Sequence, residues 1–253
     1  MTPFIDERRK PSRIRPIKAI GHMRKLLRDN EDTEQVFHIM DALNGNNMVR
    51  KLGAFAKTEK GAACLKRKCE LPEILDDHAT LKGLPDGTVG RAYVAFMERE
   101  GLTAAGLVEE SEKWFEGQER FEDDFDFYGR RMRDTHDLLH VLTGYGRDQL
   151  GETSVLAFSH AHNGGFGNLF IAYIGARDLA KKAPKSARIM DSVREARKHG
   201  RESLPLMPED IVALLREPLE SARKRLNFQV PKAYKAALDE LQNSGHLGQL
   251  SAA

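Results

Sequence analysis

The stretch from Arg131 to Val155, RMRDTHDLLHVLTGYGRDQLGETSV, concentrates side chains that could bind a metal ion. If it begins as a helix and His136 is set at 0°, His140 falls at about 40° and Asp137 at about 100°. Histidines four residues apart lie on consecutive turns of a helix, so both can coordinate the same metal ion. The spacing therefore predicts a metal site on one face of this helix.

The opposite face of the same helix is aliphatic, because Leu138, Leu139 and Leu142 fall at about 200–300°. Arg133 falls at about 60°, on the side of the ligands. Its planar guanidinium could hold a substrate carboxylate through two parallel hydrogen bonds. The alternative is a plain ion pair between Arg133 and Asp137, which is worth roughly a few tenths of a kcal/mol if exposed.

A GYG turn at 144–146 follows the helix, and the next helix is expected to begin near Leu150. A hairpin at this turn would return Glu152 towards the histidines and add a carboxylate oxygen. Imidazole and carboxylate ligands suit zinc (Zn2+), and a two-histidine site with open positions also suits Fe2+. The predicted ligand set is His136, Asp137, His140 and Glu152.

Other interpretations of this pattern stay open. H-D-x-x-H lacks the Glu that serves as general base in H-E-x-x-H metalloproteases. HD-type phosphohydrolases also use a His-Asp pair, but their separate upstream His and downstream Asp cannot be identified here. A metal hydrolase is therefore retained as a third possibility. In a purely structural interpretation, both histidines occupy ordinary helix positions without a metal.

The rest of the chain predicts an all-α protein, a single multi-helix domain with the metal site on a central helix pair. Apolar residues recur at helical spacing, and the alternating β-branched runs that are typical of strands are absent. Three long helices are expected, together with a last helix over 232–242. A helix is also expected over 91–100, with an apolar side formed by Tyr93, Phe96 and Met97. The long helices are expected over 49–69, 121–143 and 209–227.

Composition narrows the class of protein. A charged fraction of 31% beside a hydrophobic fraction of 40% is typical of a folded soluble chain. The formal net charge of +2 is too small to indicate nucleic acid binding. No apolar run approaches the roughly 18 residues of a membrane span. Cys64 and Cys69, about 140° apart on a helix, could neither bridge nor share an ion, which favours reduced thiols in a cytoplasmic protein.

Three stretches of the chain share their spacing with one known family. HDLLHVLTGYGRDQLGE has an H-D-x-x-H motif followed by eleven residues and a Glu. LPDGTVGRAYVAFM at 84–97 has a Leu-Pro-x-Gly segment, and residues 194–228 contain several arginines on expected helices. In these features the chain resembles the coenzyme Q biosynthesis protein 4 family, over residues 16–228.

The resemblance implies an all-α protein that binds a divalent metal, usually zinc, and a prenyl lipid. The implied role is oxidative decarboxylation at ring carbon 1 of a polyprenyl-4-hydroxybenzoate-derived intermediate of ubiquinone, which would make the protein a decarboxylase/hydroxylase. The alternative is a non-catalytic prenyl-lipid-binding scaffold that organises the ubiquinone biosynthetic complex. On the enzyme hypothesis, the catalytic residues are Arg133, His136, Asp137, His140 and Glu152.

The expected partners are a polyprenylated aromatic lipid substrate and other ubiquinone biosynthesis proteins, and a homodimer stays open. Basic residues over 8–18 and 66–68 could contact anionic lipid, although solvated charge is the default interpretation of such residues. The lipid substrate that the resemblance implies predicts peripheral contact without a membrane span, by a cytoplasmic protein on the inner face of the cell membrane. Residues 1–15 are expected to form a flexible basic arm, 16–228 the all-α domain, and 229–253 an extra C-terminal helix and tail.

Overall fold

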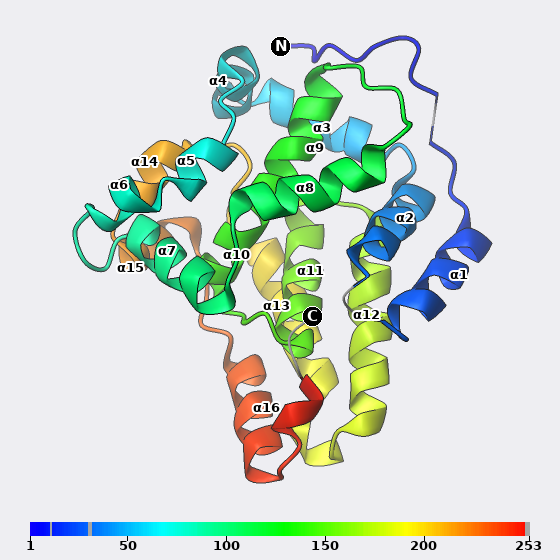
Figure 1. Cartoon of the computed structure of the whole chain (residues 1–253), viewed down its shortest axis with the longest axis vertical. Coiled ribbons are helices and arrows are strands. Elements are labelled where there is room, and N and C mark those ends of the chain that lie inside the picture. Colours follow the sequence, from blue (N-terminus) through cyan, green and yellow to red (C-terminus); the bar gives the residue numbers. More distant parts are fainter. Residues whose placement is uncertain (11, 30–31, 251–253) are drawn as a thin grey trace. The chain divides into compact units, whose positions relative to one another are not determined.

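The computed structural model describes residues 1–10, 12–29 and 32–250 of the chain. Throughout these ranges the regular elements are helices, and the one extended pairing is an isolated antiparallel bridge between Thr88 and Pro218 (Figure 1). The all-α prediction is therefore confirmed. None of the helices within the described ranges combines the length and the apolar character that crossing a bilayer requires.

The helices gather into two compact units, each assembled from stretches that are far apart in the sequence. Unit 1 comprises Met1–Ser12, Asn46–Leu142 and Pro205–Leu226, and unit 2 comprises Arg13–Gly45, Thr143–Leu204 and Asn227–Ala253. In chain order the helices are α1 (Pro16–Leu26), α2 (Thr33–Asn44), α3 (Asn47–Lys57), α4 (Glu59–Arg67), α5 (Pro72–Asp76), α6 (His78–Lys82), α7 (Val89–Glu100), α8 (Ala104–Phe115), α9 (Asp124–Asp134), α10 (His136–Thr143), α11 (Gln149–Asn163), α12 (Phe166–Lys182), η1 (Lys185–Ala187), α13 (Ile189–Glu202), α14 (Ile211–Arg216), α15 (Leu219–Leu226), α16 (Lys232–Asn243) and η2 (Leu247–Leu250).

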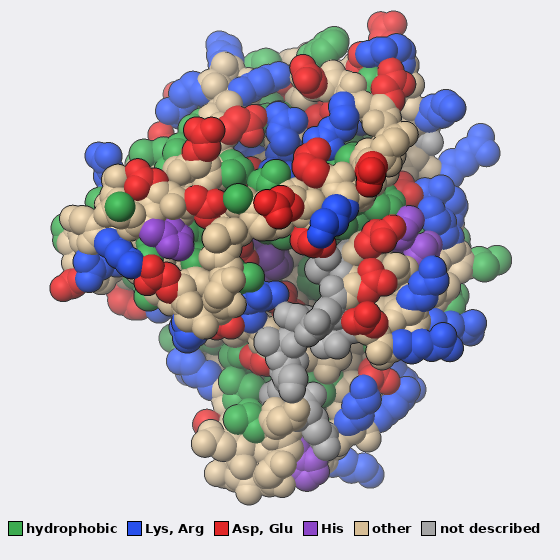
Figure 2. Space-filling view, in the orientation of Figure 1, with side chains coloured by type: hydrophobic (Ala, Val, Ile, Leu, Met, Phe, Trp, Pro, Cys, Tyr) green, Lys and Arg blue, Asp and Glu red, His purple; other side chains and the backbone are tan. Residues whose placement is uncertain are grey.

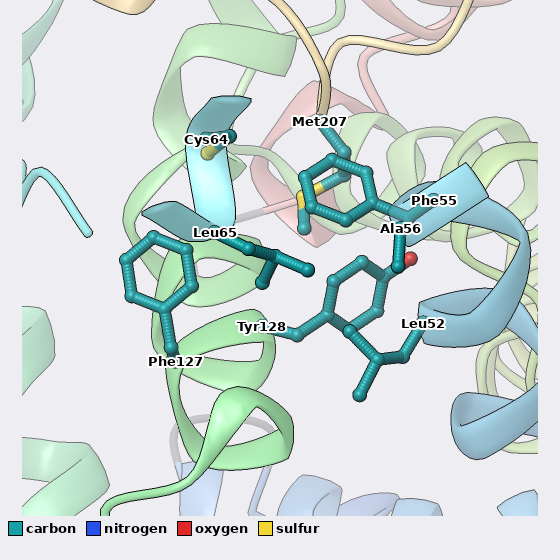
Figure 3. Packing of buried hydrophobic residues seen from close by; sticks show 8 residues of the cluster. All are labelled: Leu52, Phe55, Ala56, Cys64, Leu65, Phe127, Tyr128 and Met207. Carbon is teal, nitrogen blue, oxygen red and sulfur yellow. The ribbon is translucent and has the colours of Figure 1, made fainter. Parts of the chain in front are cut away.

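The core of unit 1 includes a cluster between α3, α4 and α9, shown in Figure 3. Phe127 and Tyr128 of α9 are both almost fully buried. The ring of Tyr128 meets that of Phe55 edge-on, with centroids 5.3 Å apart. Full burial of one large apolar side chain stabilises a fold by roughly 1.5–3 kcal/mol. This packing holds α9, the helix that leads directly into the His-Asp-x-x-His motif.

Thr135 divides the region that the sequence predicted as one helix over 121–143. Its backbone (φ −91°, ψ 1°) leaves the helical range between α9 and α10. Its hydroxyl donates to the carbonyl oxygen of Arg131 at 2.8 Å. A threonine that bonds back to the carbonyl four residues earlier competes with the main-chain hydrogen bond and bends helices. The prediction of one continuous helix is therefore wrong.

Two other predicted helices also divide. The region 49–69 breaks at Thr58, whose extended backbone (φ −79°, ψ 148°) ends α3, and whose hydroxyl caps α4 by accepting from Gly61 N at 3.0 Å. The region 209–227 breaks at Pro218, between α14 and α15. Proline has no N–H to continue the helical hydrogen bonds. In both places the predicted helix was too long.

The two cysteines are free thiols. Cys64 is buried on α4, and burial raises the pKa of its thiol. Cys69 is exposed and lies beyond the end of α4 at Arg67. The helical angle that the sequence predicted between them therefore does not apply, although neither thiol is joined in a disulfide.

The N-terminal segment binds unit 1 through its backbone and through Arg9. The amide of Phe4 donates to Asp124 Oδ2 at 2.8 Å. The guanidinium of Arg9 donates to Asp123 at 2.7 and 2.8 Å and lies over the ring of Phe121, 4.5 Å from its centroid. Burial acts to raise the pKa of Asp123, but hydrogen bonds from Arg9 and backbone amides hold it below its usual value. Arg9 is thus bonded to residues of unit 1, and the flexibility of the basic arm over residues 1–15 stays a prediction.

Unit 2 is built around α11, which packs against α12 and α13, while α1 packs on α2 and α16 on α13. Gly200 allows α13 to approach α11 closely, because a Cβ there would lie 2.3 Å from the carbonyl oxygen of Phe158. The helix predicted over 232–242 is present as α16. Unit 2 therefore carries the C-terminal helix on the same scaffold as Glu152, which lies in the first turn of α11.

Candidate metal centre

Three predicted ligands meet on α10. His136, Asp137 and His140 each offer one ligand atom, and these atoms all lie within 4.8 Å of one another. The Nε2 atoms of the two histidines are 3.3 Å apart, and their rings are nearly perpendicular at 84°. Two nitrogens bound to one tetrahedral zinc at about 2.0–2.1 Å would be about 3.3 Å apart. The donor set and its spacing therefore fit a divalent transition metal.

The ligand group is largely shielded from water. His140 is 1% exposed and Asp137 is 8% exposed, whereas His136 is half-buried. A buried carboxylate is costly unless it is paired or coordinates a metal. The aliphatic face predicted for this helix is also buried, at 0–4% exposure for Leu138, Leu139 and Leu142. The helix repeat thus separates the core side of α10 from its ligand side, as the sequence indicated.

Helix α7 forms a wall of the site. The ring of Phe96 stacks on that of His140, with centroids 5.5 Å apart and planes 19° from parallel. Burial raises the pKa of Tyr93 strongly, and the carboxylate of Asp137 adds to the rise. Both effects disfavour ionisation of the Tyr93 hydroxyl. The sequence placed both residues on the apolar side of a helix but gave no signal that this side faces the ligands.

Arg133 lies at the end of α9, where it binds its neighbour Asp134. Its Nε and Nη2 atoms both lie 2.7 Å from Asp134 Oδ1, and the two side chains are 9% and 3% exposed. Burial raises the pKa of Asp134, although the charge of Arg133 opposes this rise. Because α9 ends at Asp134, the single-helix angle assigned to Arg133 does not hold, and its observed partner is Asp134 in place of Asp137. Contact between Arg133 and a substrate stays a prediction.

Glu152 lies in unit 2, in the first turn of α11. Its Oε1 accepts from Arg147 Nε at 3.4 Å. Asp148 caps this helix by accepting from Leu150 N and Gly151 N at 3.1 and 3.0 Å. The predicted turn and the start of the next helix are therefore present. The role of Glu152 as a further ligand stays a prediction.

Comparison with known proteins agrees with these motifs. The family model described as "Coenzyme Q (ubiquinone) biosynthesis protein Coq4" matches residues 18–232. The mitochondrial ubiquinone biosynthesis protein COQ4 of Scheffersomyces stipitis is 28% identical over 175 residues, which are 68% of this chain and 51% of that protein. The mitochondrial COQ4 homolog of Danio rerio is 35% identical over 88 residues, which are 35% of this chain and 30% of that protein. The chain thus spans about half, or less, of the length of these curated relatives.

A solved structure shares the fold. It is a crystal structure of a protein from Nostoc punctiforme PCC 73102 that carries a provisional assignment to ubiquinone biosynthesis. It superposes with a TM-score of 0.64 at 19% identity, and the match covers 86% of this chain and 100% of the other. At this identity the likeness concerns the fold alone.

Proposed function

The chain belongs to the coenzyme Q (ubiquinone) biosynthesis protein Coq4 family, and on this premise we propose that it acts in ubiquinone biosynthesis as a metal-dependent enzyme. One observation carries the proposal: the ligand atoms of His136, Asp137 and His140 lie within 4.8 Å of one another on a single helix. Glu152 is the proposed fourth ligand. The proposed substrate is a polyprenyl-4-hydroxybenzoate-derived lipid whose carboxyl group is lost from ring carbon 1.

The proposed reaction is an oxidative decarboxylation, in which the carboxyl group leaves as CO2 and a hydroxyl group takes its place on the ring. This replacement is a two-electron oxidation of the ring carbon, so it requires an electron acceptor such as dioxygen. A zinc ion held by these residues would supply Lewis-acid stabilisation of a carboxylate or phenolate, and Fe2+ is the redox-active alternative. On this proposal Arg133 orients the substrate carboxylate, and Phe96 shields the His140 ring from water.

The second candidate is a non-catalytic scaffold that binds prenyl lipid and organises other ubiquinone biosynthesis proteins. The observation that favours it is the pairing of Arg133 with Asp134, because a guanidinium held by its neighbour is already satisfied without a substrate. On this alternative the metal, if bound, holds α10 in place and takes no part in chemistry.

The experiment replaces both histidines, as His136→Ala with His140→Ala, and measures metal content and ubiquinone in a strain that lacks its own protein. The matched control replaces another close pair, His22 and His38, whose rings stack 4.1 Å apart between α1 and α2. We expect the first double variant to lose its metal and at least about 90% of ubiquinone synthesis, because two of the ligands are gone. We expect the control double variant to keep its metal and its ubiquinone synthesis.

Two results would contradict the proposal. If the folded double variant at positions 136 and 140 kept full metal occupancy, the ion would have to bind elsewhere than at these histidines. Normal ubiquinone in a variant without metal, at matched expression, would favour the scaffold over the enzyme.

We also propose peripheral contact between α1 and an anionic bilayer. Ile17 is 86% exposed, Ile14 58% and Ile20 44%, while Met23 on the other side of the helix is buried. Figure 2 shows Lys and Arg side chains around α1, and its last turn carries Arg24 and Lys25. Apolar residues flanked by basic ones bind anionic lipid surfaces. On this proposal the protein lies on the inner face of the cell membrane.

Flotation with vesicles that contain anionic phospholipid tests this contact. We expect salt-sensitive binding by the wild type and at least about tenfold weaker binding by Ile17→Asp, because an inserted aliphatic side chain contributes roughly 1.5–3 kcal/mol. The control is Val212→Asp, at a partly exposed position of α14. Absence of binding at low salt, or equal binding by both variants, would argue against α1 as the lipid contact.

A further inference from the structure

We infer that Tyr234, on α16, is a positioning residue for the turn that leads into Glu152. The inference rests on the proposed function to the extent that Glu152 serves the metal site. Tyr234 lies two residues beyond the end of the range, 18–232, that matches the family model. Helix α16, which carries Tyr234, therefore begins where the matched range ends.

The hydroxyl group of Tyr234 joins α16 to both ends of the turn. It donates to Asp148 Oδ2 and accepts from Gly146 N at 2.9 Å. The other oxygen of the Asp148 carboxylate, Oδ1, caps α11 by accepting from Leu150 N and Gly151 N. One carboxylate thus connects Tyr234 to the first turn of the helix that carries Glu152.

The turn has little room to move. A Cβ on Gly151 would lie 2.0 Å from the carbonyl oxygen of Gly146, and a Cβ on Gly146 would lie 2.7 Å from the Tyr234 hydroxyl oxygen. The ring of Tyr145 meets that of Tyr234 edge-on, with centroids 5.3 Å apart, and both residues are buried. The two glycines therefore allow the backbone to pack directly on itself and on the tyrosine.

Helix α16 is itself fixed at separate points. The amide of Ala233 donates to Glu195 Oε1 of α13 at 2.8 Å. The hydroxyl of Ser186 donates to Glu240 Oε1 at 2.6 Å. Because α16 is held by these contacts, Tyr234 presents its hydroxyl to the turn from a fixed position. Without that hydroxyl, Asp148 would lose a hydrogen bond that holds it at the start of α11. The position of Glu152 in the first turn of α11 would then be less restricted.

The test is Tyr234→Phe, which removes the hydroxyl group and keeps the ring that packs on Tyr145. We expect amide hydrogen exchange over residues 146–152 of the metal-free protein to become roughly five- to tenfold faster, because two hydrogen bonds are lost. We expect zinc affinity, measured by competition with a chromogenic chelator, to fall roughly 10- to 100-fold, as for loss of a group that orients a ligand. The matched control is Ser186→Ala, which removes a different contact of α16 and should leave both readouts unchanged.

Each outcome decides the inference. Exchange over 146–152 at the wild-type rate in Tyr234→Phe overturns it. The inference also fails if Glu152→Gln binds zinc more weakly than the wild type while Tyr234→Phe binds it equally tightly. In that case the Tyr234 hydroxyl does not position the Glu152 carboxylate. If Glu152→Gln binds zinc as tightly as the wild type, Glu152 is not a ligand and that part of the proposed function fails. Faster exchange in Tyr234→Phe would still establish that Tyr234 holds the turn.

Discussion

Helix α10 and the turn before α11 hold their candidate site residues in different ways. On α10, His136, Asp137 and His140 are brought together by the helix repeat, and no distant residue is needed to set their spacing. The turn before Glu152 is hydrogen-bonded to Tyr234, which is 86 residues from Asp148 in the sequence. Ligands from one helix can therefore arise from a short motif, whereas a ligand placed by a turn requires a scaffold around it.

Among the variants that test this difference between α10 and the turn, the largest loss of ubiquinone synthesis is expected at Arg133, at the end of the helix that precedes α10. Arg133→Lys keeps the charge but loses the planar fork. We expect metal binding to be retained, because Arg133 is not a ligand, and ubiquinone synthesis in a deficient strain to fall at least about tenfold. The matched control is Arg130→Lys on the same helix, where Arg130 pairs with Glu70 at 3.0 Å. Normal ubiquinone from Arg133→Lys would limit the functional part of this region to its metal ligands.

A smaller effect is expected at Arg223, which makes a long-range contact with α10. Its Nε and Nη2 atoms donate to the carbonyl oxygens of Leu142 and Val141, both at 2.9 Å. We expect Arg223→Gln to lower the free energy of unfolding by about 1–3 kcal/mol, because hydrogen bonds from a charged group are lost. Zinc affinity should change by less than about threefold, since the helix repeat sets the ligand spacing.

The control for this variant is Arg188→Gln, because the Arg188 side chain is 77% exposed and pairs with Asp191 on the surface. We expect Arg188→Gln to change the free energy of unfolding by less than about 0.5 kcal/mol. A tenfold or larger loss of zinc affinity in Arg223→Gln would show that α10 also depends on distant contacts. That result would remove the difference between the two regions.

The same difference explains what the sequence could predict. The i, i+4 spacing of His136 and His140, and the burial of Leu138 on the opposite face, follow from the helix repeat alone. The break at Thr135 was not predictable, because apolar periodicity continues on both sides of it. At the break, the Thr135 hydroxyl donates to the carbonyl oxygen of Arg131.

Contacts between residues far apart in the sequence were not predictable around the candidate site. Phe96 had the right apolar spacing, but its stack on His140 depends on how α7 and α10 pack together. Tyr234 gave no signal either, because its partners Gly146 and Asp148 look like ordinary turn residues until the tertiary contacts are formed. An all-α fold was predictable from local patterns, whereas the packing that surrounds the site was not.

Anomalous diffraction at the zinc edge, from crystals of the full chain grown with equimolar zinc, tests the central claim most directly. We expect one peak within about 2.0–2.2 Å of Nε2 of His136, Nε2 of His140 and a carboxylate oxygen of Asp137. No peak between the histidines, with the two rings hydrogen-bonded to each other across their 3.3 Å separation, would contradict the claim that α10 holds a metal ion.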